Sequence, residues 1–357
     1  MNPLDYLKKY QNTSFKEMAF NEVDALILSM VSYVPFDDIG LDYHRHSNKE
    51  VLKLINNYRP PFDANERKLN YIEIAKIICS SSRFKNATFA FFKKSRDHVA
   101  EKQFQAITII LHEFAFVSFC GTDSTTIGWK EDFNMAYLET VPSEVEAVKY
   151  LKNVIDSFFF KKVFIGGHSK GGRLAITAAK HSRKTNRILG VYAFDAPNFP
   201  STCYDEDYKA ISKMIREYTP NESIIGRLMH EFSYKKIISS TNNLLFQHDA
   251  FSWEIDNNSF IYKDGYTERS THIVNTINYA LNNYDEEMKR QFIDTIFDFL
   301  FKMNVEKFPN EREWIPLLVS KFPAARQLWK ETPKEKRAVV KKMLFNVAKD
   351  YLLKKKD

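Results

Sequence analysis

The chain has 357 residues, of which 44% are hydrophobic and 15% aromatic, and its formal net charge is +7. This composition supplies enough apolar residues for a folded core and excludes a disordered chain. Nine Lys and Arg against three Asp and Glu lie from residue 334 onward. Most of the positive charge therefore belongs to the C-terminal end, and it does not indicate a surface for nucleic acid.

Three features bear on the cellular compartment. The chain has no apolar stretch with the length and purity of a transmembrane helix, and its first ten residues lack the apolar run of a signal peptide. Its three cysteines, Cys79, Cys120 and Cys203, are widely separated and form neither a C-x-x-C motif nor a disulfide framework. These features predict a cytoplasmic protein.

The N-terminal part of the chain predicts helices followed by strands. Met18–Tyr33 has apolar residues at helical spacing, with Asn21 as a cap, and Tyr71–Cys79 repeats that spacing. Between them, His44–Pro61 mixes charged residues with a pair of prolines and predicts a surface excursion. Short runs rich in Phe, Ile and Val then predict three strands, at 89–92, 105–111 and 114–120.

From residue 142 to residue 240, predicted helices and strands alternate. The helices are expected at 142–158 and 173–181, and the strands at 162–166, 188–194, 214–218 and 235–240. Apolar strands that alternate with helices are typical of a mostly parallel sheet with helices on both faces. The sequence therefore predicts the α/β class.

The chain beyond this region predicts a short hairpin and then helices. The hairpin is expected within 252–262, and a helical pattern runs from Thr271 to the end with breaks at four prolines, Pro309, Pro316, Pro323 and Pro333. We expect two regions, an α/β domain over 1–284 and a helical C-terminal region over 285–357.

One segment in the middle of the predicted sheet carries a catalytic pattern. Residues 163–179 read VFIGGHSKGGRLAITAA, which places Ser169 in a G-x-S-x-G motif between an apolar strand and an Ala-rich helix. A sharp turn that lifts a serine hydroxyl above a sheet leaves no room for neighbouring side chains, and four of the ten glycines lie within 166–172. The motif predicts a nucleophile at Ser169; the alternative is an ordinary strand-to-helix turn with a surface serine.

A serine nucleophile needs a base and an acid, and in sheets of this kind the chain order is serine, acid, histidine. His248, in the loop after strand 235–240, is the predicted base. Glu222, in the loop after strand 214–218, is the preferred acid. Asp195, directly after strand 188–194, is the alternative acid, and Asp249 ranks behind both because adjacent side chains rarely face each other.

The negative charge that develops on a substrate in such a reaction requires two backbone N–H donors. Lys170, the residue after the nucleophile, supplies one. The segment Phe119–Asp123 ends strand 114–120 and offers the other, which we expect at Thr122, since Gly121 gives the turn its backbone freedom. These motifs imply neither a metal ion nor an organic cofactor.

The same motifs give the chain a family resemblance. It resembles the class 3, or fungal triacylglycerol, lipases, and more closely a group of lipase-like α/β-hydrolases of unsettled function from low-GC bacteria. The segments that carry the resemblance lie within roughly residues 20–260. They are 21–26, 82–86, 103–106, 119–123, 128–134, the strand-to-helix turn around Ser169 (the elbow), 223–226, 247–249 and Trp253. The resemblance implies an α/β-hydrolase fold with Ser169 as nucleophile, His248 as base, and Thr122 and Lys170 around the oxyanion.

Three residues depart from the pattern of these relatives. Cys120 stands where they usually have Arg, and Lys170 stands where secreted lipases have Leu, which places a cation beside the nucleophile. Glu222 occupies the acid position in place of a clear Asp. The acid is therefore the least defined member of the triad.

Together these observations predict a serine hydrolase for carboxylic esters or thioesters with a hydrophobic or lipid-like acyl group. The alternative is a catalytically idle hydrolase fold that serves as a binding or membrane-associated module. The last helix offers a route to a membrane, because an apolar stripe, formed by Val340, Leu344, Val347 and Tyr351, lies opposite several lysines. We expect this stripe to pack on the protein itself, with contact to a membrane surface as the alternative.

Overall fold

The centre of the structure, a computed structural model that describes residues 1–230, 234–307 and 314–353, is a mixed sheet of eight strands that lie side by side in chain order. The strands are β1 (His46–Ser47), β2 (Thr88–Asp97), β3 (Lys102–Ile110), β4 (Ala115–Phe119), β5 (Val163–His168), β6 (Ile188–Phe194), β7 (Ile215–Pro220) and β8 (Lys236–Ile238). β1 to β4 pair in antiparallel fashion, and β4 to β8 pair in parallel. The predicted α/β class, with a mostly parallel sheet, is confirmed.

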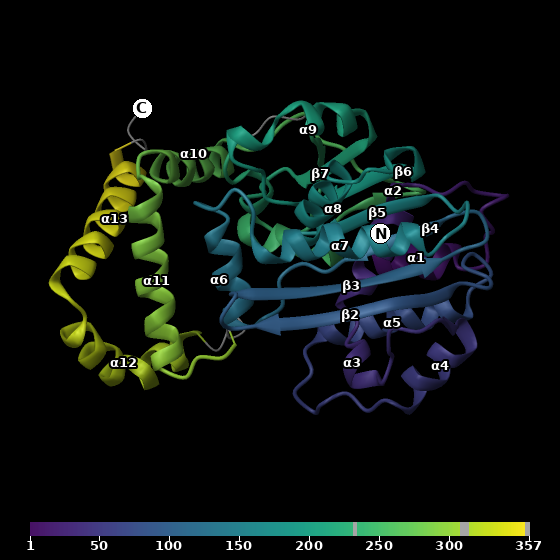
Figure 1. Cartoon of the computed structure of the whole chain (residues 1–357), viewed down its shortest axis with the longest axis horizontal. Coiled ribbons are helices and arrows are strands. Elements are labelled where there is room, and N and C mark those ends of the chain that lie inside the picture. The colour runs from purple at the N-terminus through teal and green to yellow at the C-terminus, as the bar shows by residue number, and fades with distance from the viewer. Residues whose placement is uncertain (231–233, 308–313, 354–357) are drawn as a thin grey trace.

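Helices cover both faces of this sheet (Figure 1). They are α1 (Pro3–Tyr10), α2 (Glu22–Met30), α3 (Phe36–Ile39), α4 (Asn48–Asn57), α5 (Glu66–Ser80), α6 (Thr126–Asn134), α7 (Pro142–Asp156), α8 (Lys170–Lys180) and α9 (Glu206–Ile211). One apolar core packs α1, α2 and α5 against side chains such as Phe116 and Tyr192. The other packs α7 and α8 against side chains such as Val117 and Ile165. The near-continuous apolar strands follow from this burial on two sides.

Local signals fix where the elements begin. The side chain of Asn21 accepts hydrogen bonds from the backbone N–H of Val23 (2.9 Å) and of Asp24 (3.1 Å), while the Asp24 carboxylate accepts one from the Asn21 N–H. This reciprocal cap satisfies N–H groups that a helix start leaves without intrahelical partners. The helix predicted from Met18 therefore begins at Glu22. The expected hairpin also forms, as β9 (Ile255–Asp256) and β10 (Ser259–Phe260) in a separate small sheet.

Four helices follow: α10 (Glu268–Asn282), α11 (Glu286–Lys302), α12 (Trp314–Glu331) and α13 (Lys334–Leu353). α11, α12 and α13 extend beyond one end of the α/β region (Figure 1). The predicted breaks at Pro316 and Pro323 are wrong, because α12 runs through both residues. Pro316 lies in the first turn, where its missing N–H has no intrahelical partner to lose, and Pro323 removes one hydrogen bond without ending the helix. Pro309 lies outside the described residues.

The C-terminal helices attach to α6. Phe297 of α11 packs edge-on against Phe133 of α6, with ring centroids 5.5 Å apart, and Lys130 Nζ lies 3.1 Å from Asp294 Oδ1. The expected boundary, near Tyr284, falls between α10 and α11. α10 nevertheless packs against α13, so α10, which precedes the expected boundary, also contacts the C-terminal helices.

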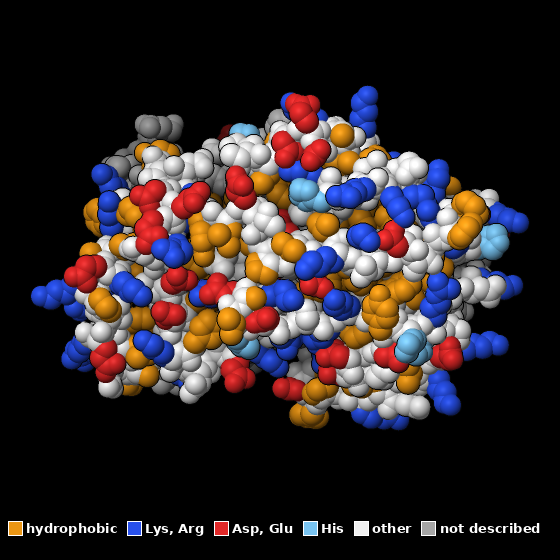
Figure 2. All heavy atoms as spheres, in the orientation of Figure 1, with side chains coloured by type: hydrophobic (Ala, Val, Ile, Leu, Met, Phe, Trp, Pro, Cys, Tyr) orange, Lys and Arg blue, Asp and Glu red, His pale blue; other side chains and the backbone are white. Residues whose placement is uncertain are grey.

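The predicted apolar stripe of the last helix is only partly covered. On α13, Val340 and Met343 are buried, and Met343 packs with Ala280 and Tyr284, whereas Leu344 is exposed, as is the neighbouring Phe345. The side chains of Val347 and Tyr351 lie outside the described residues. On the face shown in Figure 2, acidic and basic side chains are interspersed over these helices. Within the described parts of the chain, no helix combines the length and apolarity needed to cross a bilayer.

Candidate active site

Ser169 stands at the junction of β5 and α8, on a turn that the backbone can make only under strain. Its φ and ψ are 58° and −135°, in a region that non-glycine residues rarely occupy. The Ser169 N–H donates to the carbonyl of Phe194 (2.8 Å), which ties the turn to the adjacent strand. A Cβ at Gly171 would lie 2.1 Å from the carbonyl oxygen of Phe119. The predicted elbow is therefore present, and glycine is required for its close packing on β4.

Asp195 follows β6 directly and lies at the same edge of the sheet as Ser169. β5 and β6 are in register at His168 and Phe194, so the two strands end side by side. Asp195 has a positive φ of 46°, and its N–H donates to the carbonyl of Tyr218 on β7 (2.7 Å). The strand ends thus present a serine and an aspartate on neighbouring, strained backbone positions.

His248 lies against Asp195. Its Nδ1 is 2.6 Å from Asp195 Oδ2, while the hydroxyl of Ser223 donates to Asp195 Oδ1 (2.5 Å). The Asp195 side chain is 1% exposed and that of His248 is 27% exposed. Because both carboxylate oxygens have partners, the carboxylate is held in place. The contact at Nδ1 leaves Nε2 as the nitrogen that is free for proton transfer.

Glu222, the preferred acid in the sequence analysis, does not contact His248. Its carboxylate accepts hydrogen bonds from the backbone N–H of Leu244 (3.1 Å) and from the hydroxyl of Thr267 (3.2 Å). These contacts brace the start of the 3-10 helix Leu244–His248. Asp195, the alternative acid, occupies the position at His248 that Glu222 was expected to fill.

The residues on either side of His248 hold its loop from two directions. The side-chain amide oxygen of Gln247 accepts the N–H of Glu222 (2.8 Å). Asp249, the third-ranked acid, caps the next short helix and forms an ion pair with Arg67 on α5 at 3.1 Å. Its carboxylate is thus engaged away from the imidazole of His248.

His168, the residue before the nucleophile, also supports His248. The two imidazole centroids are 4.6 Å apart, and His168 Nε2 is 2.8 Å from the carbonyl oxygen of His248. A carbonyl only accepts, so Nε2 carries a proton, while the hydroxyl of Tyr33 lies 3.1 Å from Nδ1 and 3.2 Å from the carbonyl oxygen of His168. Burial, followed by the proximity of His248, holds the pKa of His168 well below its usual value. His168 is therefore neutral and fixed in one tautomer.

The segment expected to form the oxyanion hole passes beside the nucleophile. A Cβ at Gly121 would lie 3.1 Å from the Cβ of Ser169 and 2.7 Å from the carbonyl oxygen of His168. Thr122 donates its hydroxyl to Asp132 on α6. Lys170 is the first residue of α8, and the N–H groups of a first helical turn have no partner within the helix. The structure thus brings the segment that contains Thr122 next to Ser169, which Lys170 follows directly in the chain.

Sequence reasoning missed three supporting residues. Tyr33, Ser223 and Glu131 each contact a predicted site residue or its immediate neighbour, yet they come from segments far apart in the chain. Ser223 and Glu131 lie in segments that carry the family resemblance, which was the available signal for them. Tyr33 gave no signal beyond its place at the end of a helical pattern.

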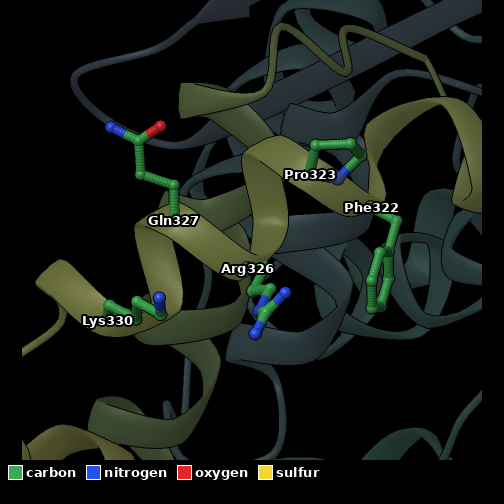
Figure 3. Close-up of a pocket in the computed structure, with 5 residues that line it drawn as sticks. All are labelled: Phe322, Pro323, Arg326, Gln327 and Lys330. Carbon is green, nitrogen blue, oxygen red and sulfur yellow. The ribbon is translucent and has the colours of Figure 1, made fainter.

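Two grooves occur on the C-terminal helices, and neither is lined by Ser169 or His248. One, of about 490 Å³, runs along α12 and is lined by Phe322, Pro323, Arg326, Gln327 and Lys330 (Figure 3). The other, of about 350 Å³, lies among α10, α11 and α13. Among the described residues, no three His, Cys, Asp or Glu side chains gather in a way that would hold a metal ion.

Comparison with known proteins gives one family model and several distantly similar solved structures. A family model described as Mbeg1-like matches residues 78–298. No curated protein matches the chain. A fungal lipase structure shares 15% identity over 68% of this chain and 84% of its own, with a TM-score of 0.43.

Two further solved structures show the same likeness. Native Rhizomucor miehei lipase, in a propeptide complex, shares 11% identity over 66% of this chain and 79% of its own, with a TM-score of 0.43. Lip2 lipase from Yarrowia lipolytica shares 10% identity over 68% of this chain and 97% of its own, with a TM-score of 0.35. At these identities the likeness concerns the fold alone.

Proposed function

Since the chain belongs to the Mbeg1-like family and carries Ser169 on a strand-to-helix elbow, we propose that it is a serine hydrolase that cleaves carboxylic esters or thioesters. The observation that carries this proposal is the 2.6 Å contact between His248 and Asp195 at the end of the strand next to that of Ser169. A serine, an oriented histidine and a buried carboxylate in this arrangement are the parts of an acyl-transfer site.

The proposed reaction has two halves, acylation of Ser169 and hydrolysis of the acyl-enzyme, and these groups act in both. Ser169 Oγ attacks the carbonyl carbon of the substrate while His248 Nε2 takes the hydroxyl proton, and Asp195 stabilises the imidazolium that forms. The N–H groups of Thr122 and Lys170 stabilise the oxyanion. The intermediate collapses, the alcohol or thiol leaves with the proton from His248, and the acyl group remains on Ser169. Water then attacks the acyl group while His248 takes its proton, and the carboxylic acid leaves as His248 returns the proton to Ser169.

The surroundings of His248 support a substrate with a hydrophobic acyl group. Leu245 and Phe246, in the same short helix as His248, are 55% and 51% exposed. Exposed apolar side chains beside a catalytic centre favour contact with an apolar ligand. A lipid-like ester or thioester is therefore the proposed substrate class.

A role at a membrane surface is the second candidate, and the C-terminal helices favour it. The exposed side chains of Leu344 and Phe345 follow Lys341 and Lys342 on α13, and exposed Phe322 lies with Arg326 and Lys330 along the groove on α12 (Figure 3). Cationic and apolar side chains on one helix suit an anionic lipid surface. This contact is compatible with catalysis, and it also suits the alternative of an idle fold that only binds.

A fluorophosphonate probe separates enzyme from idle fold, because it forms a covalent adduct only with an activated serine. We expect the wild-type protein to form one adduct, at Ser169, and the Ser169→Ala variant to form none. Ser182→Ala, which removes a serine just after α8, is the matched control and should label as wild type does. A folded wild-type protein without a Ser169-dependent adduct would refute the enzyme and leave the binding role.

A further inference from the structure

The side chain of Lys170 lies in a buried polar cluster that the proposed reaction does not use. It is 1% exposed. Its ammonium donates to the carbonyl oxygen of Gln103 (3.2 Å), to the side-chain oxygen of Gln103 (2.7 Å) and to Glu131 Oε2 (3.0 Å). All three ammonium protons therefore have acceptors. Burial disfavours the charged form, but Glu131 and Asp132 raise the pKa of Lys170 above its usual value, so it is a cation.

Two contacts link this cation to the oxyanion loop, residues 120–123. Asp132 Oδ1 lies 3.5 Å from Lys170 Nζ, and the other carboxylate oxygen of Asp132 accepts the hydroxyl of Thr122. Gln103 presents its amide oxygen to Lys170 and donates from its amide nitrogen to the carbonyl of Gly121 (3.5 Å). The ammonium thus reaches both Gly121 and Thr122 through one intermediate side chain each.

Glu131 holds the cluster in a fixed position. It is fully buried, and it accepts the backbone N–H of Gln103 on β3 (2.9 Å) and that of Ser143 on α7 (2.8 Å) in addition to Lys170. A buried carboxylate with partners from β3, α7 and α8 is fixed in position by the packing of those elements. A lysine paired to it is fixed in turn.

We propose that the Lys170 side chain is a positioning group for the oxyanion hole, an inference that rests on the proposed function. The backbone N–H of Lys170 is one donor to the oxyanion. Its ammonium, through Asp132 and Gln103, holds the loop that carries the other donor at Thr122. One residue thereby sets the spacing between the two donors.

This role has a specific kinetic consequence. The oxyanion exists only in the transition state and the tetrahedral intermediate, so donors that drift apart weaken transition-state binding and leave ground-state binding nearly unchanged. The loss should appear in kcat rather than in KM. Removal of a whole donor costs about 10²–10³-fold in kcat. Loosening one donor should cost about 10–100-fold, less than its removal.

The test compares Lys170→Met with the double variant Lys170→Met/Glu131→Gln, which removes the charge of the fully buried partner carboxylate and leaves only that of the partly exposed Asp132. The introduced glutamine keeps one acceptor oxygen for the two backbone N–H groups that Glu131 accepts. Arg83→Met is the matched control, since Arg83 and Asp24 form a fully buried ion pair near the opposite end of the sheet. Each folded variant is assayed for p-nitrophenyl butyrate hydrolysis and for the rate of fluorophosphonate labelling at Ser169.

We expect both Lys170 variants to lose about 10–100-fold in kcat and in labelling rate, with KM changed less than about threefold. Arg83→Met should lower thermal stability but retain kcat. Wild-type labelling together with wild-type kcat in the folded double variant overturns this inference and leaves the proposed function intact. A wild-type protein that neither labels nor hydrolyses the ester refutes both.

Discussion

The contact between Asp195 and His248 makes the substitution Asp195→Asn the sharpest test of the site. Asparagine can keep the geometry, because its oxygen can face His248 Nδ1 while its amide nitrogen faces the hydroxyl of Ser223, which now donates at 2.5 Å. The change then removes the charge but little volume. The same exchange in a serine protease triad lowers kcat by about 10⁴-fold. We expect a loss of about 10³–10⁴-fold, or about 4–5.5 kcal/mol of transition-state stabilisation.

The matched comparison is Glu222→Gln, which replaces the other candidate acid. Glutamine retains an oxygen that can accept the N–H of Leu244, now 3.1 Å from the Glu222 carboxylate. Loss of the charge on this brace should cost about 1 kcal/mol, which corresponds to less than tenfold in rate. Both variants are assayed by ester hydrolysis and by fluorophosphonate labelling, after circular dichroism has established that they are folded. If Glu222→Gln loses as much activity as Asp195→Asn, or if Asp195→Asn keeps full activity, the assignment of Asp195 is refuted.

Three other predictions follow from contacts around the site and from the C-terminal helices. In Gly226→Ala the new Cβ would lie 2.2 Å from Asp195 Oδ1. We therefore expect the free energy of unfolding to fall by about 1–3 kcal/mol and the fluorophosphonate to label Ser169 more slowly. Unchanged labelling rates and denaturation curves would contradict this. Because the pKa of His168 is lower in the folded than in the unfolded protein, the unfolded state binds more protons and stability should fall as the pH drops below about 6.5. Urea denaturation at pH 7 and pH 5 should show a smaller fall for His168→Gln, and equal falls would argue against a buried neutral His168. Truncation after Pro333 should abolish sedimentation with anionic vesicles; equal sedimentation with and without α13, or none in the full chain, speaks against the membrane role.

The sequence predicts the elbow well because its causes are local. The glycines, the apolar strand before Ser169 and the helical pattern after it all lie within 163–179. The same holds for the sheet, since apolar strands alternate with amphipathic helices along the chain. α12 is the exception. Proline usually ends a helix, but α12 continues on both sides of Pro323. The hydrogen bond that this proline removes is therefore not enough to end the helix there.

The acid could not be chosen from the sequence, because the rule available there does not discriminate. The order serine, acid, histidine is satisfied by Asp195 and by Glu222 alike, since both lie between Ser169 and His248 in the chain. What separates them is the end of β6, where Asp195 adopts a positive φ and turns its carboxylate to His248. Lys170 is a similar case: the motif predicts its backbone role, but its buried side-chain partners come from β3 and α6, far away in sequence.

An acid at the end of β6, as we propose, changes which parts of the fold control the chemistry. Ser169 and Asp195 follow paired positions of two adjacent parallel strands, so the register of β5 and β6 sets their relative placement. In this proposal the segment after β7 supports the acid but does not supply it, because Ser223 contacts Asp195 and Glu222 contacts the loop of His248. Strand register is difficult to shift in a sheet buried on both faces, because a slip of one residue would turn every side chain to the other face. The pair of Ser169 and Asp195 should therefore be the most rigid part of the site, and His248, on a braced loop, the part most sensitive to substitutions outside the sheet.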